Sequence, residues 1–225
     1  MWVTGLNYED FLRKEIFDFR FGSASASLGN RKLCGDYFEC FRTESKAYII
    51  MSDGMGTGGR AAIDSAMTVE LFSRLIRAGI SLDTALGITN TALTVKSDDE
   101  SLSTLDVAEI DLFDGTTVLL KAGAAPSFYT FSGRVREVEI PSTPLGILSK
   151  VKFIRYTLRL RAGDTLVMVS DGVTMGNDEC PWLIDLLSAP MPDSMDSLRK
   201  DIIKRALTAG SEDDLSAIAI RGGER

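Results

Sequence analysis

Apolar residues recur along this chain with two different periods, and each period predicts a different kind of element. Over residues 61–78 they fall every three or four positions, and Val69, Phe72 and Ile76 are examples. This is the spacing of one face of a helix. Gly79 follows directly and is typical of a helix end, so we predict a helix that stops there.

Further helices are indicated by stretches of the same kind. Ser81 is a favoured N-cap residue, and we expect a helix to run from it to about Val95. Two more helices are expected over residues 182–188 and 194–208. Residues 1–16 have the pattern of an amphipathic lead-in helix.

The other apolar segments are short and bounded by Gly, Asp or Ser, as is typical of strands. Residues 22–35 are rich in Gly and Ser, and we interpret them as a loop. Strands are predicted over residues 17–21, 37–41, 47–51, 103–113, 116–123, 127–131, 134–140, 152–160, 165–170 and 215–220.

The connections between these strands indicate the fold class. Asp114-Gly115 and Ser132-Gly133 are hairpin turn signals, and consecutive strands joined by short turns pair antiparallel. Two adjacent helices after residue 60 interrupt a βαβ rhythm. No linker or low-complexity stretch divides the chain, so we predict one α+β domain over residues 17–222 after the lead-in helix.

The most informative feature of the composition is the complete absence of histidine. It excludes a Ser-His-Asp triad, a Cys-His pair, H-E-x-x-H zinc sites and a phosphohistidine intermediate. The formal net charge of -7 disfavours a nucleic-acid or anionic-membrane surface. Any hydrolysis would need carboxylates, a metal-activated water, or a Lys or Tyr base.

The lack of a targeting signal and the spacing of the cysteines predict a cytoplasmic protein. No apolar run approaches the roughly 18 to 20 residues that span a bilayer, and the N-terminal stretch lacks the apolar core of a signal peptide. Cys34, Cys40 and Cys180 lack metal-type spacing, and none has an Arg six positions later. We interpret them as reduced thiols.

Aspartates stand where the predicted structure changes abruptly. Apolar strands deliver Asp53 and Asp171 to their C-terminal ends, each inside a Ser-Asp-Gly triplet. Asp36 follows a glycine, and Asp213-Asp214 precede the last strand. Converging carboxylates repel one another, and hard divalent cations such as Mg2+ or Mn2+ prefer oxygen ligands. These positions therefore predict a site for two cations, about 3.5 to 4 Å apart, that activates a water.

Each aspartate also has a simpler interpretation. An isolated Asp-Gly is more often a turn than a ligand, so the hypothesis depends on the repeated triplet. Asp213-Asp214 alone would also fit a solvated turn. Asp106 and Asp111 lie within a strand pattern and are expected to face solvent.

An ordered series of motifs resembles the PPM-type (protein phosphatase 2C-like) metal-dependent serine/threonine phosphatases. The motifs are GDYF, IIMSDGMGTGGRA, STLDVAEIDL, KAGAAPSF, PLGIL, AGDTLVMVSDG and EDDLSAIAI. Within that family they are most similar to catalytic domains of the stage II sporulation protein E type. The resemblance implies a four-layer α-β-β-α sandwich, with two antiparallel β-sheets flanked by helices and a two-metal site at one edge.

The resemblance also implies roles for individual residues. Asp214 would support the metal ligands. Arg31 stands five positions before the first metal Asp, where many eukaryotic members have a phosphate-binding Arg, but it is equally well an ordinary loop charge. The catalytic metal ligands that the resemblance implies for two Mn2+ or Mg2+ ions are Asp36, Asp53, Gly54 through its carbonyl, Asp171 and Asp213.

The activity implied is hydrolysis of phosphoserine or phosphothreonine by a metal-activated water. A phosphorylated protein of the anti-anti-sigma-factor type, in bacterial sporulation or stress signalling, is the leading candidate substrate. A second copy of the chain is a further candidate partner. The chain would be cytoplasmic, alone or as the catalytic domain of a larger membrane-anchored or sensor protein.

Two rival interpretations stay open at this point. Gly54-x-Gly56-x-x-Gly59 follows a strand and precedes a helix, which matches a dinucleotide-binding fingerprint of an oxidoreductase. Asp53 would repel the pyrophosphate of such a ligand, and the second Ser-Asp-Gly would stay unexplained. The other alternative is a catalytically silent phosphatase fold kept as a regulatory module.

Overall fold

The structure is a computed structural model that describes most of the chain. The described ranges are residues 20–26, 34–56, 58–96, 101–149, 154–176, 180–192 and 194–223, and for 20–26 only the backbone is described. The predicted lead-in helix over 1–16 and Arg31 lie outside these ranges. In the described part of the chain, no helix is both long and apolar enough to cross a bilayer.

Ten described strands form two five-stranded sheets, and every pairing between neighbouring strands is antiparallel. The first, called here the β3 sheet, contains in spatial order β2 (Asp36–Arg42), β3 (Lys46–Asp53), β4 (Leu105–Asp111), β5 (Thr116–Ala122) and β8 (Arg155–Arg159). The second, called here the β10 sheet, contains β1 (Arg20–Ala26), β10 (Leu215–Arg221), β9 (Thr165–Val169), β6 (Ser127–Phe131) and β7 (Arg134–Val138).

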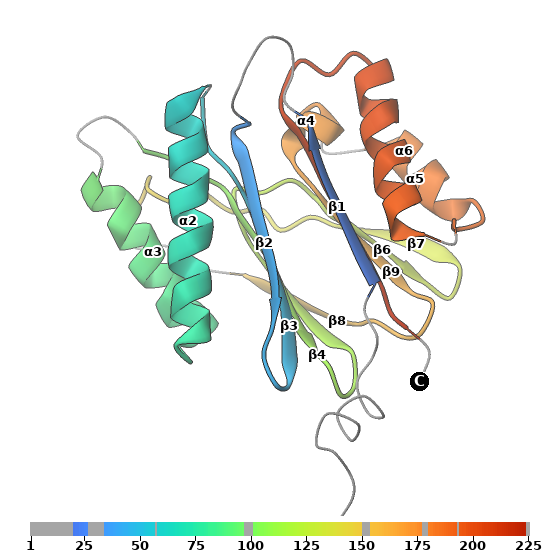
Figure 1. The fold of residues 1–225 in the computed structure, drawn as a ribbon, viewed down its shortest axis with the longest axis horizontal. Helices are drawn as coiled ribbons and strands as arrows, with labels where there is room; N and C mark the ends of the chain where they lie inside the picture. The colour runs from blue at the N-terminus through green and yellow to red at the C-terminus, as the bar shows by residue number, and fades with distance from the viewer. Residues whose placement is uncertain are drawn as a thin grey trace, which may run out of the picture.

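The described helices cover the outer faces of the sheets. Figure 1 shows one pair on the left, beside the β3 sheet, and a second pair on the right, beside the β10 sheet. The first pair is α2 (Gly59–Arg77) and α3 (Leu82–Lys96), and the others are α4 (Asp171–Thr174), α5 (Pro181–Ser188) and α6 (Met195–Thr208). The predicted four-layer α-β-β-α sandwich is therefore confirmed.

Strands β3 and β9 read as nearly continuous apolar runs because both of their faces are buried. In β3, Ile49 and Met51 point into the core between the sheets, whereas Ile50 packs under α2 and α3. In β9, Met168 joins the core between the sheets and Val167 packs under α5 and α6. Each full burial of such a side chain contributes about 1.5 to 3 kcal/mol, so these strands fix the layers.

The hairpin and capping signals are confirmed. Asp114-Gly115 joins β4 to β5, and Ser132-Gly133 joins β6 to β7 with positive φ at both residues. The Ser81 hydroxyl accepts a hydrogen bond from the Thr84 backbone N–H near the start of α3.

The prediction for the first strand was wrong. Residues 22–26 were interpreted as a loop, but they form most of β1, whose seven residues pair with β10 from Arg20–Arg221 to Ala26–Leu215. Small Gly and Ser residues have low strand propensity, and pairing along the edge of the sheet overrides it. The strand predicted at 17–21 coincides with β1 at Arg20 and Phe21, and its first three residues lie outside the described ranges.

Candidate metal centre

The first two predicted carboxylates meet at one end of the β3 sheet. Asp36 opens β2 and Asp53 closes β3, and the antiparallel register makes them direct partners across the ladder. Asp36 is buried and Asp53 is half-buried. The Asp53 backbone N–H donates to the Thr104 hydroxyl at 2.8 Å, which fixes the end of the strand against the segment before β4.

Gly54 follows because the start of α2 leaves no room for a side chain. A Cβ at this position would lie 1.9 Å from the carbonyl oxygen of Ala61. The Gly54 N–H donates to the Gly35 carbonyl at 3.2 Å, so the residues next to both aspartates are joined by their backbones.

The other predicted carboxylates come from the β10 sheet. Asp171 begins the short helix α4 directly after β9, and Asp213 lies two residues before β10. A Cβ on Gly172 would lie 2.1 Å from the Asp214 carbonyl oxygen, so only glycine permits this approach of the two segments. The Ser211 hydroxyl donates to the Gly172 carbonyl at 2.8 Å and holds them together.

Asp214 links the two sheets. Its Oδ2 accepts a hydrogen bond of 2.6 Å from the Gly35 backbone N–H, directly before Asp36. Its own N–H donates to Asp213 Oδ1 at 2.8 Å. The contact with Gly35 positions the start of β2 against the start of β10.

The electrostatics show that four carboxylates face one another. Burial, followed by the charges of Asp36, Asp171 and Asp213 in that order, raises the pKa of Asp53 to about 9. Loss of hydration, followed by the charge of Asp213, also raises the pKa of Asp171, although its side chain reaches solvent. The charges of neighbouring carboxylates thus disfavour the ionised forms of Asp53 and Asp171.

The surroundings of Asp36 show whether this group of carboxylates suits a divalent cation. Burial raises its pKa to about 6, against the opposing effect of the Ser216 and Ser170 hydroxyls. Its Oδ2 is buried without a hydrogen-bond partner among the described residues. A buried carboxylate oxygen is costly when nothing balances it, and a hard divalent cation is the counter-charge that an all-oxygen donor set suits.

The donor set is divided between the sheets. Within the described ranges, no three acidic or thiol side chains already stand at the spacing of a complete cation cage. One pair of carboxylates belongs to the β3 sheet and the other to the β10 sheet. The fit to a cation therefore rests on the chemistry of the oxygens and on the unpaired Asp36 Oδ2.

A buried ion pair lies in the row of Met51, two residues along β3 from Asp53. Asp106 in β4 and Lys121 in β5 are direct cross-strand partners, and their side chains are 1% and 0% exposed. Lys121 Nζ donates to Asp106 Oδ2 at 2.5 Å. The prediction that Asp106 faces solvent was therefore wrong. Asp111, by contrast, is half-buried, and its Oδ1 accepts the Phe113 N–H in the following turn.

Two hollows border Asp171. One, of about 390 Å³, is lined by α4 and by residues 210–213. The other, of about 220 Å³, is bounded by residues 123–126, residues 139–142, Asp171 and Thr174. The carboxylates thus stand beside recesses that a ligand can enter.

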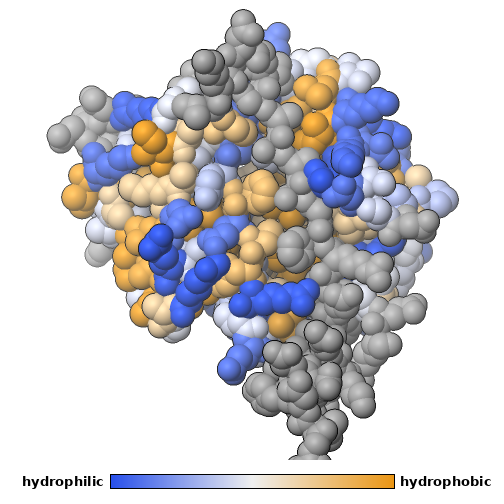
Figure 2. All heavy atoms as spheres, viewed as in Figure 1, coloured by the Kyte–Doolittle hydropathy of each residue, from blue (hydrophilic) through white to orange (hydrophobic). Residues whose placement is uncertain are grey.

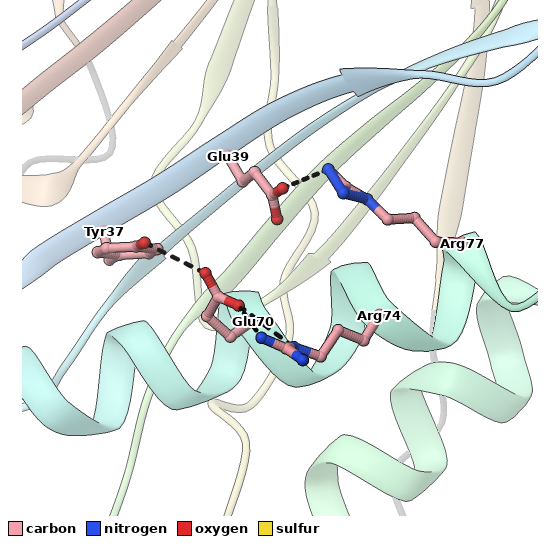
Figure 3. A network of polar contacts seen from close by, with 5 residues as sticks. All are labelled: Tyr37, Glu39, Glu70, Arg74 and Arg77. Atoms are coloured by element: carbon pink, nitrogen blue, oxygen red, sulfur yellow. Dashed lines mark hydrogen bonds and ion pairs between the residues drawn. The ribbon is translucent and has the colours of Figure 1, made fainter.

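A polar network attaches α2 to the strand that begins with Asp36. Figure 3 shows Tyr37 and Glu39 of β2 facing Glu70 and Arg77 of the helix. The Tyr37 hydroxyl donates to Glu70 Oε1 at 3.3 Å, and Arg77 pairs with Glu39. These contacts lie on partly exposed surface and fix how α2 lies against the edge of the sheet.

Comparison with solved structures places this fold among PP2C-type phosphatase domains. The structure of the PP2C phosphatase domain and a regulatory fragment of SpoIIE from Bacillus subtilis aligns with a TM-score of 0.84 and 27% identity, over 93% of this chain and 64% of that one. RsbX in complex with magnesium aligns with a TM-score of 0.75 at 17% identity, over 91% and 96% of the two chains, and shows the fold alone.

Sequence comparison identifies the family within this class. The family model for stage II sporulation protein E (SpoIIE) matches residues 43–222, and the chain belongs to that family. Stage II sporulation protein E of Bacillus subtilis is 30% identical over 97% of this chain, and the phosphoserine phosphatase RsbU of the same organism is 25% identical over 87%. The chain spans 27% of the first of these relatives and 61% of the second.

The antiparallel topology contradicts the dinucleotide-binding interpretation. That fingerprint requires parallel strands on either side of its helix, whereas β3 pairs antiparallel with β4 after α2 and α3. The glycines at 54, 56 and 59 instead carry the chain from the end of β3 into α2.

Proposed function

We propose that this chain is a metal-dependent protein serine/threonine phosphatase whose catalytic groups are Asp36, Asp53, Asp171 and Asp213. One observation carries the proposal. Two strand ends of one sheet and two strand boundaries of the other deliver four mutually repelling carboxylates to the same place. Asp36 and Asp53 would hold cations from one side, with the Gly54 carbonyl, and Asp171 and Asp213 from the other.

The chain's own residues account for the arrangement that this reaction needs. When bound, two divalent cations lower the pKa of water and offset the charge that develops on a transferred phosphoryl group. Asp214 holds Gly35, and thereby Asp36, in place from the opposite sheet. Thr104 holds the backbone of Asp53. With no histidine in the chain, the carboxylates and their cations carry the chemistry.

The finer assignments belong to this proposal as well. We take Mn2+ or Mg2+ as the cations and a phosphorylated protein of the anti-anti-sigma-factor type as the substrate, supported by membership of the SpoIIE family. The phosphatase domain extends over residues 17–222, supported by the pairing of β1 with β10. It acts in the cytoplasm. Arg31 stays a predicted phosphate ligand outside the described residues.

A second copy of the chain is the other partner we propose. Figure 2 shows hydrophobic residues gathered at the left, over the helices α2 and α3. Exposed apolar side chains on these two helices include Ile63, Ile88 and Val95, and Val95 is 79% exposed. A helix pair with such a surface suits self-association, which sedimentation would detect as a dimer.

The experiment is hydrolysis of p-nitrophenyl phosphate with and without Mn2+. We expect turnover that requires the metal and leaves no phosphate on the protein. Full activity in excess EDTA, or a trapped phosphoprotein, contradicts the proposal. Metal binding without any turnover would favour the alternative of a silent regulatory module.

A further inference from the structure

The buried pair of Lys121 and Asp106 lies close beneath the candidate metal centre. The ladder places Met51, Asp106 and Lys121 in one row, and Asp53 lies two residues beyond Met51 on the same face of β3. Leu119, two residues before Lys121 on β5, points into the core between the sheets, so the pair lies at the end of that core. Burial raises the pKa of Asp106 and lowers the pKa of Lys121, while each partner opposes this change.

Stability alone does not explain a pair at this place. Removing two charges from water costs several kcal/mol each, and well-packed apolar residues often replace a buried ion pair without loss. Asp106 Oδ1 accepts no hydrogen bond of ordinary geometry in the described part of the chain, although the Ser127 hydroxyl is near enough to lower the pKa of Asp106. Lys121 also makes a second hydrogen bond, in which its Nζ donates to the Ala125 carbonyl at 2.7 Å. This bond suggests a role in positioning the segment that contains Ala125.

That bond holds a segment that approaches the metal centre. Gly123 begins the segment with φ +65, and a Cβ there would lie 2.4 Å from Pro144. The Gly123 N–H donates to the Ser142 hydroxyl at 3.0 Å. Residues 123–126 are therefore held by Lys121 from inside and by residues 142–144 from the side.

Residues 123–126 form one wall of the cavity of about 220 Å³ that also touches Asp171 and Thr174. The charged side chains that line it are Glu139 and Asp171, both acidic, and no Lys or Arg is among the lining residues in the described ranges. Because Asp171 is a proposed cation ligand whose charge bound cations would offset, Glu139 is the charge that remains to disfavour an anionic group in this cavity. Polypeptide next to a phosphorylated residue is the part of a phosphoprotein that fits such a recess.

We infer that Lys121 is a positioning residue that holds residues 123–126 as the wall of this cavity, and that the cavity receives substrate polypeptide flanking the phosphorylated residue. The inference rests on the proposed function and deepens it. It separates two kinds of substrate, because a small aryl phosphate has no flanking polypeptide and does not need the wall.

The test compares two substrates with the full chain at saturating Mn2+. Lys121→Met removes both bonds of the ammonium group and keeps much of the side-chain volume. We expect KM for phosphorylated casein to rise about tenfold, because small misplacement of positioning groups has large kinetic effects. We expect kcat/KM for p-nitrophenyl phosphate, per folded molecule, to stay within about twofold of the wild type.

The control is Leu119→Ala, which lies on the same strand and face but makes no bond to residues 123–126. It should lower stability and leave both KM values unchanged. The double variant Asp106→Leu/Lys121→Met should recover stability through apolar packing, yet keep the raised KM for casein, because the bond to Ala125 is still missing.

A variant at the wall itself keeps the test decisive if Lys121→Met fails to fold. Ala124 is half-buried and lines the cavity, so Ala124→Leu should fill it and raise KM for casein alone. Unchanged KM for casein in Ala124→Leu and the double variant, or equal losses on both substrates, would overturn the inference. A wild type inactive on p-nitrophenyl phosphate would instead overturn the proposed function, and this inference with it.

Discussion

Asp53 and Asp106 are both aspartates near the same end of the β3 sheet, and their surroundings differ in one respect. Asp106 faces Lys121, so the protein supplies the counter-charge itself. Asp53 faces Asp36, Asp171 and Asp213, so the protein supplies only more negative charge. A carboxylate with an internal partner is typical of a structural contact, whereas carboxylates gathered without one are typical of a cation site.

The largest effect is expected at the carboxylates around Asp53, which have no internal counter-charge. Asp53→Asn and Asp171→Asn should each lower Mn2+-dependent hydrolysis of p-nitrophenyl phosphate by several orders of magnitude, because each removes a charge that holds cations. Both variants should stay folded by circular dichroism. In metal-free buffer, Asp53→Asn should be at least as stable as the wild type, since carboxylate repulsion is relieved. Near-normal kcat at saturating Mn2+ would contradict the site assignment.

Asp106, whose charge is balanced by Lys121, should respond in the opposite way. Asp106→Asn leaves the Lys121 ammonium buried without its counter-charge and should cost about 3 to 5 kcal/mol of unfolding free energy. Urea denaturation in metal-free buffer measures this. A loss below about 1 kcal/mol would mean that the pair is not an ion pair in solution.

Metal addition should separate the two sites again. Mn2+ at about 100 times its Kd should stabilise the wild type by about 2.7 kcal/mol, seen as a rise in Tm. The rise should grow between about pH 6 and about pH 9, because protons compete with the metal at Asp36 and Asp53, whose pKa values are raised to about 6 and about 9. Asp53→Asn should lose most of this rise, and Lys121→Met should keep it. Equal rises in all three proteins would contradict the assignment.

The smallest effect is expected for a charge pair that is partly exposed. Arg77 and Glu39 join α2 to β2 with side chains 45% and 26% exposed. A double-mutant cycle with Arg77→Ala and Glu39→Ala should give a coupling energy below about 1 kcal/mol, because solvent screens such pairs. A coupling energy of about 3 kcal/mol or more would mean that burial does not distinguish this pair from Asp106 and Lys121.

Strand-end aspartates could be predicted from the sequence because their signal is local. An apolar run that stops at Ser-Asp-Gly is visible within a few residues, as at Asp53 and Asp171. Asp106 could not be predicted in the same way. Its partner Lys121 lies fifteen residues away, and only the register of β4 and β5 brings them together.

Other features depend on contacts between distant segments and left no local trace. β1 is a strand because β10 lies beside it, not because of its own Gly and Ser residues. Likewise, Asp214 contacts Gly35 across 179 positions of sequence. The strand β1 could be predicted only by recognising that β10 would otherwise have an unpaired edge. The contact between Asp214 and Gly35 could be predicted only from the complete fold.

The pairing of β1 with β10 also has a mechanical consequence. Arg20 and Arg221 are partners at one end of the ladder, and Ala26 and Leu215 are partners at the other end, next to Asp214. A force that pulls Arg20 and Arg221 apart loads the interstrand hydrogen bonds one after another, as in opening a zipper, because these bonds run perpendicular to the strands. Tension applied at this end would therefore peel β1 away at low force, and the bonds nearest the carboxylates would break last.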